Sequence, residues 1–184
     1  MSDEVELLLL TGPAGIGKST LSWEMSAQLE RPAVPHAVIE TDELDRVFPK
    51  PSRDELQRIW PGTIDISAIN LAAIWSTYKA LGRSRLIMSG VMLHPAFDRR
   101  WILQAIPQAR VTIVRLCGSD ETIAERLRQR EAAMAGGDQL ARSLRQAQLM
   151  QNEAVEGFIR IQTDARSPSD IAADLLRRIG WLAG

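Results

Sequence analysis

The run Gly12-Pro13-Ala14-Gly15-Ile16-Gly17-Lys18-Ser19 decides how the amino-terminal part of the chain folds. The residues before it, 5–10, form a short apolar run that is typical of a buried parallel strand. The residues after it favour a helix over 18–29, because the apolar side chains recur on one helical face. The sequence therefore predicts a strand, a glycine-rich turn and a helix in direct succession.

The same run has the residue types that hold phosphate. Gly12, Gly17, Lys18 and Ser19 fit the pattern G-x-x-x-x-G-K-[ST]. Glycines let backbone N–H groups turn toward one point, and the following helix adds its positive dipole end. We expect Lys18 to reach the terminal phosphates of ATP and the Ser19 hydroxyl to ligate Mg²⁺. The predicted nucleotide-binding residues of the loop are Gly12, Pro13, Ala14, Gly15, Ile16, Gly17, Lys18, Ser19 and Thr20.

The rest of the chain alternates strands with helices. Further strands are predicted at 37–40, 86–88, 111–117 and 158–162. The predicted helices include a brief stretch that follows Thr41-Asp42 and reaches Phe48, and a last helix over 169–179. This alternation predicts an α/β fold with a parallel sheet covered by helices on both faces, built as one domain over 1–184. Parallel sheets bind ligands beyond the carboxyl ends of their strands, so the loops after these strands should surround the site.

Composition narrows the possible partners. The 184 residues carry 22 basic and 23 acidic side chains, for a formal net charge of −1, which argues against a broad nucleic-acid surface. The acidic start of the chain does not resemble a secretory signal, and no segment approaches the length of a membrane span. Cys117 is the single cysteine and cannot form an internal disulfide, which favours a reducing environment. We expect a cytoplasmic protein.

Together these features resemble the small P-loop kinases: gluconate, shikimate and adenylylsulfate kinases, chloramphenicol phosphotransferase and the AAA_33-type group. The resemblance covers nearly the whole chain. It implies a three-layer αβα sandwich, a five-stranded parallel sheet in the order 2-3-1-4-5, and a helical lid at about 126–150. Gly136-Gly137 would supply a flexible joint inside this lid. In that group the second strand ends in an aspartate that faces the transferred phosphoryl group, and Glu40-Thr41-Asp42 matches it here.

Asp42 has two interpretations. A carboxylate at that position can accept the proton of an attacking hydroxyl or hold a magnesium-bound water. It can equally cap the short helix that follows. Arg46, one turn later, fits a contact to an anionic or hydroxylated acceptor, or an ion pair at the surface. The third predicted strand, 86–88, and the Ser89-Gly90 pair that ends it contain no carboxylate, so metal binding should depend on Ser19, the phosphates, water and Asp42.

The resemblance also implies a role for two arginines. Small P-loop kinases carry arginines after the fourth strand, on the segment that closes over the phosphates, and 122–131 looks like that segment. Arg126 and Arg130 lie four residues apart and share a helix face. One would stack near the adenine and the other would contact the phosphates. The alternative is a solvated charged face, which we expect for Arg128.

Three functions stay open at this stage. The first is an ATP-dependent kinase that moves the γ-phosphoryl group to a hydroxyl of a small molecule, with Lys18, Asp42, Arg126 and Arg130 as catalytic residues. The second is a nucleoside or nucleoside monophosphate kinase, which requires several arginines around the acceptor. The third is an ATP-binding regulatory module with little transfer activity. The sequence identifies neither the acceptor nor the oligomeric state.

Overall fold

The computed structural model describes residues 4–91, 95–131, 145, 149–150 and 158–182, and the side chains of these residues except 95–96 and 129–131. Its centre is a five-stranded sheet in the order β2-β3-β1-β4-β5. Every neighbouring pair of strands is parallel, which confirms the predicted topology. The strands are β1 Val5–Thr11, β2 Ala37–Glu40, β3 Arg85–Gly90, β4 Ala109–Cys117 and β5 Ile159–Gln162.

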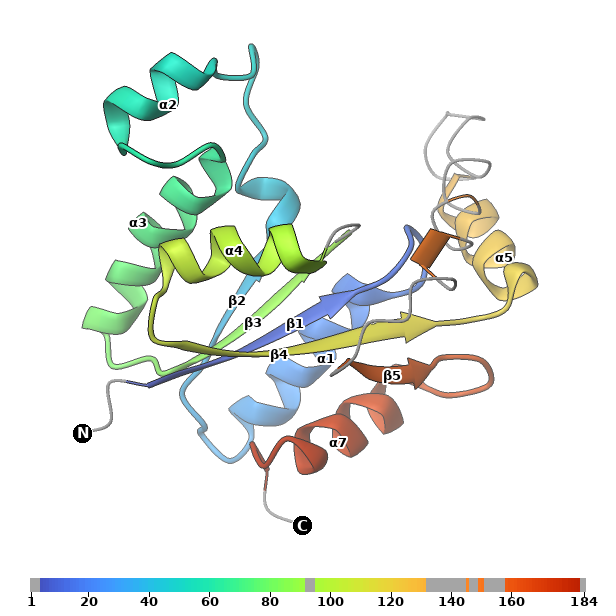
Figure 1. Ribbon diagram of the computed structural model, residues 1–184. Coiled ribbons are helices and arrows are strands. Elements are labelled where there is room, and N and C mark those ends of the chain that lie inside the picture. The colour runs from blue at the N-terminus through green and yellow to red at the C-terminus, as the bar shows by residue number, and fades with distance from the viewer. Residues whose placement is uncertain (1–3, 92–94, 132–144, 146–148, 151–157, 183–184) are drawn as a thin grey trace.

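Helices cover both faces of this sheet (Figure 1). One layer contains α3 and α4, and the opposite layer contains α1 and α7, as the predicted sandwich requires. The helix α5 follows β4 and lies beyond the carboxyl end of that strand. The helices are α1 Lys18–Glu30, the 3₁₀ helix η1 Thr41–Glu43, α2 Arg53–Ile59, α3 Ile66–Ala80, α4 Pro95–Ala105, α5 Asp120–Glu131 and α7 Pro168–Arg178.

The central strand β1 shows why its sequence is apolar without alternation. Leu8 and Leu10 pack with α1 and α7, whereas Leu7 and Leu9 pack with α3 and α4 on the other face. All four side chains are at most 1% exposed. Burying a leucine contributes roughly 1.5–3 kcal/mol, so this strand joins the two cores of the molecule.

Some element boundaries differ from the sequence prediction. β3 continues past Met88 to Gly90, because Ser89 and Gly90 pair with the last two residues of β1. α7 begins at Pro168 rather than Ser169, because the Ser167 hydroxyl caps the helix by accepting a hydrogen bond from the Asp170 N–H. The helical stretch predicted up to Phe48 was wrong: only Thr41–Glu43 is helical there.

The predicted lid lies mostly outside the described residues. Of its expected span, 126–150, the structure describes 126–131 at the end of α5, together with residues 145, 149 and 150, which are helical. The predicted joint at Gly136-Gly137 is not among these residues. In the described part of the chain, every helix is too short or too polar to cross a bilayer.

A buried arginine on β4 contacts two residues that precede β5, Met150 and Phe158. Arg115 on β4 is 1% exposed. Its Nη1 donates to the Met150 carbonyl at 2.7 Å, and its guanidinium lies 5.1 Å from the centre of the Phe158 ring. Hydrogen bonding and ring contact offset part of the cost of burying this charge. Met150 and Phe158 are thereby held against β4, whose end lies beside the glycine-rich loop at 12–20.

Candidate functional site

The glycine-rich loop between β1 and α1 is held tightly from two sides. Gly15 has a φ of 80°, which favours glycine, and a Cβ on it would lie 2.7 Å from Cγ of Leu127 on α5. A Cβ on Gly12 would lie 2.8 Å from the Leu116 carbonyl oxygen on β4. The loop therefore sits between the end of β4 and the inner face of α5, and larger residues would displace it.

Lys18 lies against the backbone of this loop. Its Nζ donates to the carbonyl oxygens of Gly12 and Pro13, both at 2.9 Å. Gly17 immediately precedes α1 and has a φ of 104°, so the loop turns directly into the first turn of the helix. The ammonium group and the helix N-terminus therefore provide positive charge at the same end of the sheet.

A cavity of about 660 Å³ opens beside the loop at the carboxyl ends of the strands. Residues from the end of each strand, or from the loop after it, contribute to its walls, as parallel-sheet geometry predicts. Gly12 and Pro13 do not line the cavity. Their carbonyl oxygens accept hydrogen bonds from Lys18, which does line it. The lining residues are Ala14–Leu21, Glu40, Asp42, Glu43, Arg46, Ser89, Gly90, Val91, Leu116, Arg126, Thr163, Arg166, Pro168 and Ile171.

The structure joins Ser19 to a carboxylate that the sequence analysis did not single out. The Ser19 hydroxyl donates to Oε2 of Glu40, the last residue of β2, at 3.0 Å. Side chains alternate along a strand, and Val38, two residues earlier, packs on the core beneath α1. Glu40 therefore faces the first turn of α1. Alternation along β2 is the signal in the sequence that could have drawn attention to Glu40, although it does not show that Ser19 is the partner.

Asp42 lies on η1, directly after β2, and lines the same cavity with an exposed side chain. The position of η1 depends on Gly90 at the end of β3. A Cβ on Gly90 would lie 1.7 Å from Oγ1 of Thr41, so a residue with a side chain would push η1 away. Close packing of backbone at Gly90 is thus what brings Asp42 to the mouth of the cavity.

Arg46 also lines the cavity, and it has a surface ion pair. Its Nη2 lies 2.9 Å from Oε1 of Glu43, and both side chains are more than half exposed. Exposed pairs of this kind contribute little to stability, so Arg46 can exchange this partner for an anionic ligand at small cost. Both interpretations made from the sequence are therefore compatible with the position of Arg46.

Arg126 joins α5 to the phosphate loop and to the loop after β5. Its Nη1 donates to the Ile16 carbonyl at 2.7 Å and to Oγ1 of Thr163 at 3.1 Å, and its Nη2 donates to the Thr163 carbonyl at 3.4 Å. The guanidinium is therefore fixed at the wall of the cavity.

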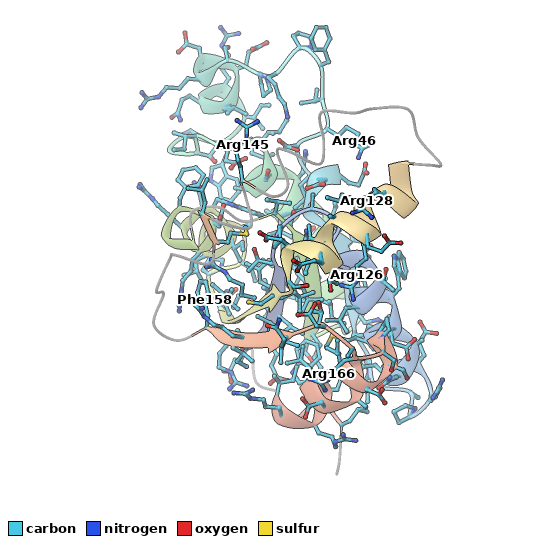
Figure 2. The ribbon with its side chains drawn as sticks, turned by 90° about the vertical axis from the view of Figure 1, so that its right-hand side faces the viewer. Arg46, Arg126, Arg128, Arg145, Phe158 and Arg166 are labelled. Atoms are coloured by element: carbon cyan, nitrogen blue, oxygen red, sulfur yellow. The ribbon has the colours of Figure 1, made fainter. Side chains whose placement is uncertain are left out.

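The neighbouring arginines occupy different positions. Arg128 is exposed and pairs with Glu125 at 2.6 Å, consistent with the solvated face expected for it. Arg130 belongs to α5, and its side chain is outside the described part of the structure. Figure 2, seen from the side of α5, shows Arg126 beneath this helix, with Arg46 above it and Arg166 below, from three separate segments.

Asp164 links the loop after β5 to the start of α5. Its carboxylate accepts hydrogen bonds from the backbone N–H of Ser119 at 3.1 and 3.2 Å and from the Gln162 amide. A hydrogen bond from the Thr122 side chain is the main cause that lowers the pKa of Asp164, and the Gln162, Ser119 and Arg126 interactions add to it. The ionised carboxylate thus ties together the segments that position Arg126.

We expect Asp164→Ala to lower the free energy of unfolding by about 1 kcal/mol at pH 7, because the bonds from Thr122 and Ser119 are lost. Because folding lowers this pKa, the contribution is complete above the ordinary carboxyl pKa of about 4 and is lost as the pH falls through the lower folded-state value. Urea unfolding at a series of pH values measures it. A difference from the parent that does not shrink as the pH falls below the ordinary carboxyl pKa would contradict the assignment.

Residues 7–155 match the family model AAA_33, described as an AAA domain. No curated protein matches the chain in sequence.

Several solved structures share the fold over almost the whole chain. A tunicamycin resistance protein from Deinococcus radiodurans has a TM-score of 0.62 at 16% identity, covering 96% of both chains. A gluconokinase from Sinorhizobium meliloti 1021 has a TM-score of 0.54 at 21% identity, covering 97% of this chain and 98% of that one. A shikimate kinase from Acinetobacter baumannii, in complex with shikimate, has a TM-score of 0.56 at 15% identity, covering 97% and 94%. At these identities the likeness concerns the fold.

Proposed function

The chain belongs to the AAA_33 family, and on that premise we propose that it is an ATP-dependent phosphotransferase that moves the γ-phosphoryl group to a hydroxyl of a small molecule. One observation carries the proposal. A single cavity is lined by the phosphate loop, by the carboxylates at the end of β2 and by Arg126, which are the groups that such a transfer needs. The named gluconokinase and shikimate kinase with this fold support the same reaction class.

The nucleotide side of the site is built from the loop and α5. The backbone N–H groups of 14–20 and the Lys18 ammonium group would bind the β- and γ-phosphates. Arg126 would stabilise the negative charge that develops on the transferred group or contact the base, because its guanidinium is already fixed beside Ile16. Arg130 stays a candidate for the second of these two roles.

The residues at the end of β2 also suit magnesium. Ser19 and Glu40 present a hydroxyl and a carboxylate oxygen 3.0 Å apart. Mg²⁺ prefers oxygen ligands and is usually held by one or two protein groups together with phosphates and water, so this small donor set fits it. When bound there, the cation would neutralise charge on the phosphates. We assign to Glu40 the metal role that the sequence analysis had left to Asp42.

Asp42 is then free to act on the acceptor. It would accept the proton of the acceptor hydroxyl as that oxygen bonds to the γ-phosphorus and the bond from the γ-phosphorus to the bridging oxygen of ADP breaks. Arg46, on the same wall of the cavity, would orient the acceptor. The alternative role of Asp42 as a helix cap has no support in η1, whose N-cap is Glu40 with no side-chain cap bond.

Incubation with γ-labelled ATP, Mg²⁺ and a pooled set of small hydroxylated metabolites tests the proposal. We expect label in one non-nucleotide acceptor. Transfer confined to nucleosides or their monophosphates would establish the second function, and tight ATP binding without transfer would establish a regulatory module. An absence of both binding and transfer would contradict all three.

A further inference from the structure

Ser89, near the end of β3, faces the same helix turn as Glu40. Ile87, two residues earlier on β3, packs on the core beneath α1, whereas Met88 packs on the opposite face. Because side chains alternate along a strand, Ser89 shares the α1 face with Ile87. β2 and β3 are paired so that Glu40 is directly opposite Ser89. The two polar side chains therefore lie side by side, next to the turn that carries Ser19.

The Ser89 hydroxyl is buried without a hydrogen bond. The residue is 2% exposed, and its Oγ has no partner among the residues that the structure describes. A buried hydroxyl left unsatisfied loses the hydrogen bonds that it made to water, so folded proteins rarely retain such a group. Yet Ser89 lines the cavity beside the glycine-rich loop. A hydroxyl with no protein partner that borders a cavity is positioned for a ligand.

The chemistry around Ser89 identifies the kind of ligand. P-loop enzymes often carry an acidic residue at the end of a core strand, where it supports the bound cation, and β3 ends here in Ser89-Gly90 without a carboxylate. The neighbouring carboxylate, Glu40, is instead bonded to the hydroxyl of Ser19. Mg²⁺ keeps several waters when it binds with phosphates, and those waters need oxygen partners in the protein.

We infer that Ser89 is a positioning residue for the cation: its hydroxyl and the Glu40 carboxylate together replace the carboxylate that β3 lacks. Ser89 would hydrogen-bond a water of the metal or the Glu40 oxygen that turns toward it. This inference rests on the proposed function, because it requires a nucleotide–metal complex in the cavity. It assigns to Ser89 a role that depends on the metal and does not involve the phosphates directly.

Calorimetric titration with ADP, in Mg²⁺ and again in EDTA, tests the inference on the full chain. The parent should bind ADP more tightly with Mg²⁺. Ser89→Ala should reduce that enhancement by about fivefold to tenfold, as expected for one lost hydrogen bond, and should leave the affinity in EDTA unchanged. Glu40→Gln should reduce the enhancement in the same selective way, and the double variant should lose less than the product of the two single losses.

Stability separates this role from a structural one. Because the Ser89 hydroxyl bonds to no group in the part of the chain that the structure describes, Ser89→Ala should unfold at a urea concentration equal to or above that of the parent. Ser26→Ala is the matched control: this buried serine on α1 contacts the His36 ring at 2.8 Å, far from the loop. It should lower stability and leave the effect of Mg²⁺ on ADP binding unchanged.

Each contrary result has a distinct meaning. If the parent binds no ADP in either buffer, the proposed function fails. If the parent binds with a Mg²⁺ enhancement that Ser89→Ala retains in full, the inference about Ser89 is wrong while the proposed function stands. Equal loss of affinity in Mg²⁺ and in EDTA, or a marked loss of stability in Ser89→Ala, would also overturn it, because either would show a structural role.

Discussion

Lys18→Ala is expected to lower the rate of phosphoryl transfer by about 10²–10³-fold and to weaken ATP binding at least tenfold. The ammonium group is held beside the loop by the carbonyls of Gly12 and Pro13, and under the proposed function it would stabilise the negative charge that develops on the phosphates. Alanine keeps the helix start and removes the charge. Transfer kinetics with labelled ATP, and calorimetry with ATP and Mg²⁺, measure the two effects.

Lys50→Ala provides the matched control for the loss of one lysine. Lys50 is exposed, pairs with Asp45 at 2.8 Å and does not line the cavity. Lys50→Ala should leave both the rate of phosphoryl transfer and the affinity for ATP within about twofold of the parent values. Circular dichroism of Lys18→Ala should show the parent's helix content. A folded Lys18→Ala protein with unchanged turnover would refute the assignment of the phosphate loop.

Asp42→Asn is expected to reduce turnover by about 10²–10⁴-fold, the range for removal of a general base, while ATP binding is retained. Asparagine has nearly the same shape, so η1 should keep its place against Gly90, but the amide cannot accept the acceptor's proton. Steady-state kinetics with the identified acceptor measure turnover, and calorimetry with ATP measures the affinity for nucleotide. The effect should appear in kcat rather than in the affinity for nucleotide.

Asp45→Asn is the control for this change. It removes a carboxylate three residues further along, whose side chain pairs with Lys50 and lies outside the cavity wall. It should alter kcat by less than about twofold. Parallel loss of ATP binding and turnover in Asp42→Asn would instead mean that Asp42 maintains the structure of the site. Glu40 and Glu43 would then be the remaining carboxylates on this wall to test as the base.

The alternation of strands and helices could be predicted because each element depends on nearby residues. The apolar run of β1, the Ser52–Glu55 capping box before α2 and the Asp65 cap of α3 all act within a few residues, and the structure contains each of them. The predicted bounds of an element were wrong where contacts between residues distant in the sequence set its length. β3 extends to Gly90 because β1 is there to pair with it, and η1 stops at Glu43 although the sequence favoured a longer helix.

The sequence by itself determined the glycine-rich loop between β1 and α1, because its residues lie within one run of nine, 12–20, whose glycine spacing sets the backbone. Only the tertiary structure decided which carboxylate meets Ser19, where the Arg126 guanidinium is fixed, and that the Ser89 hydroxyl is buried with no partner among the described residues. Ser19 and Glu40 are 21 residues apart, and Ile16 and Arg126 are 110 apart. Such pairs meet only because the sheet order brings the carboxyl ends of β1, β2, β3 and β4 to one edge, and no local pattern of residues encodes that distance.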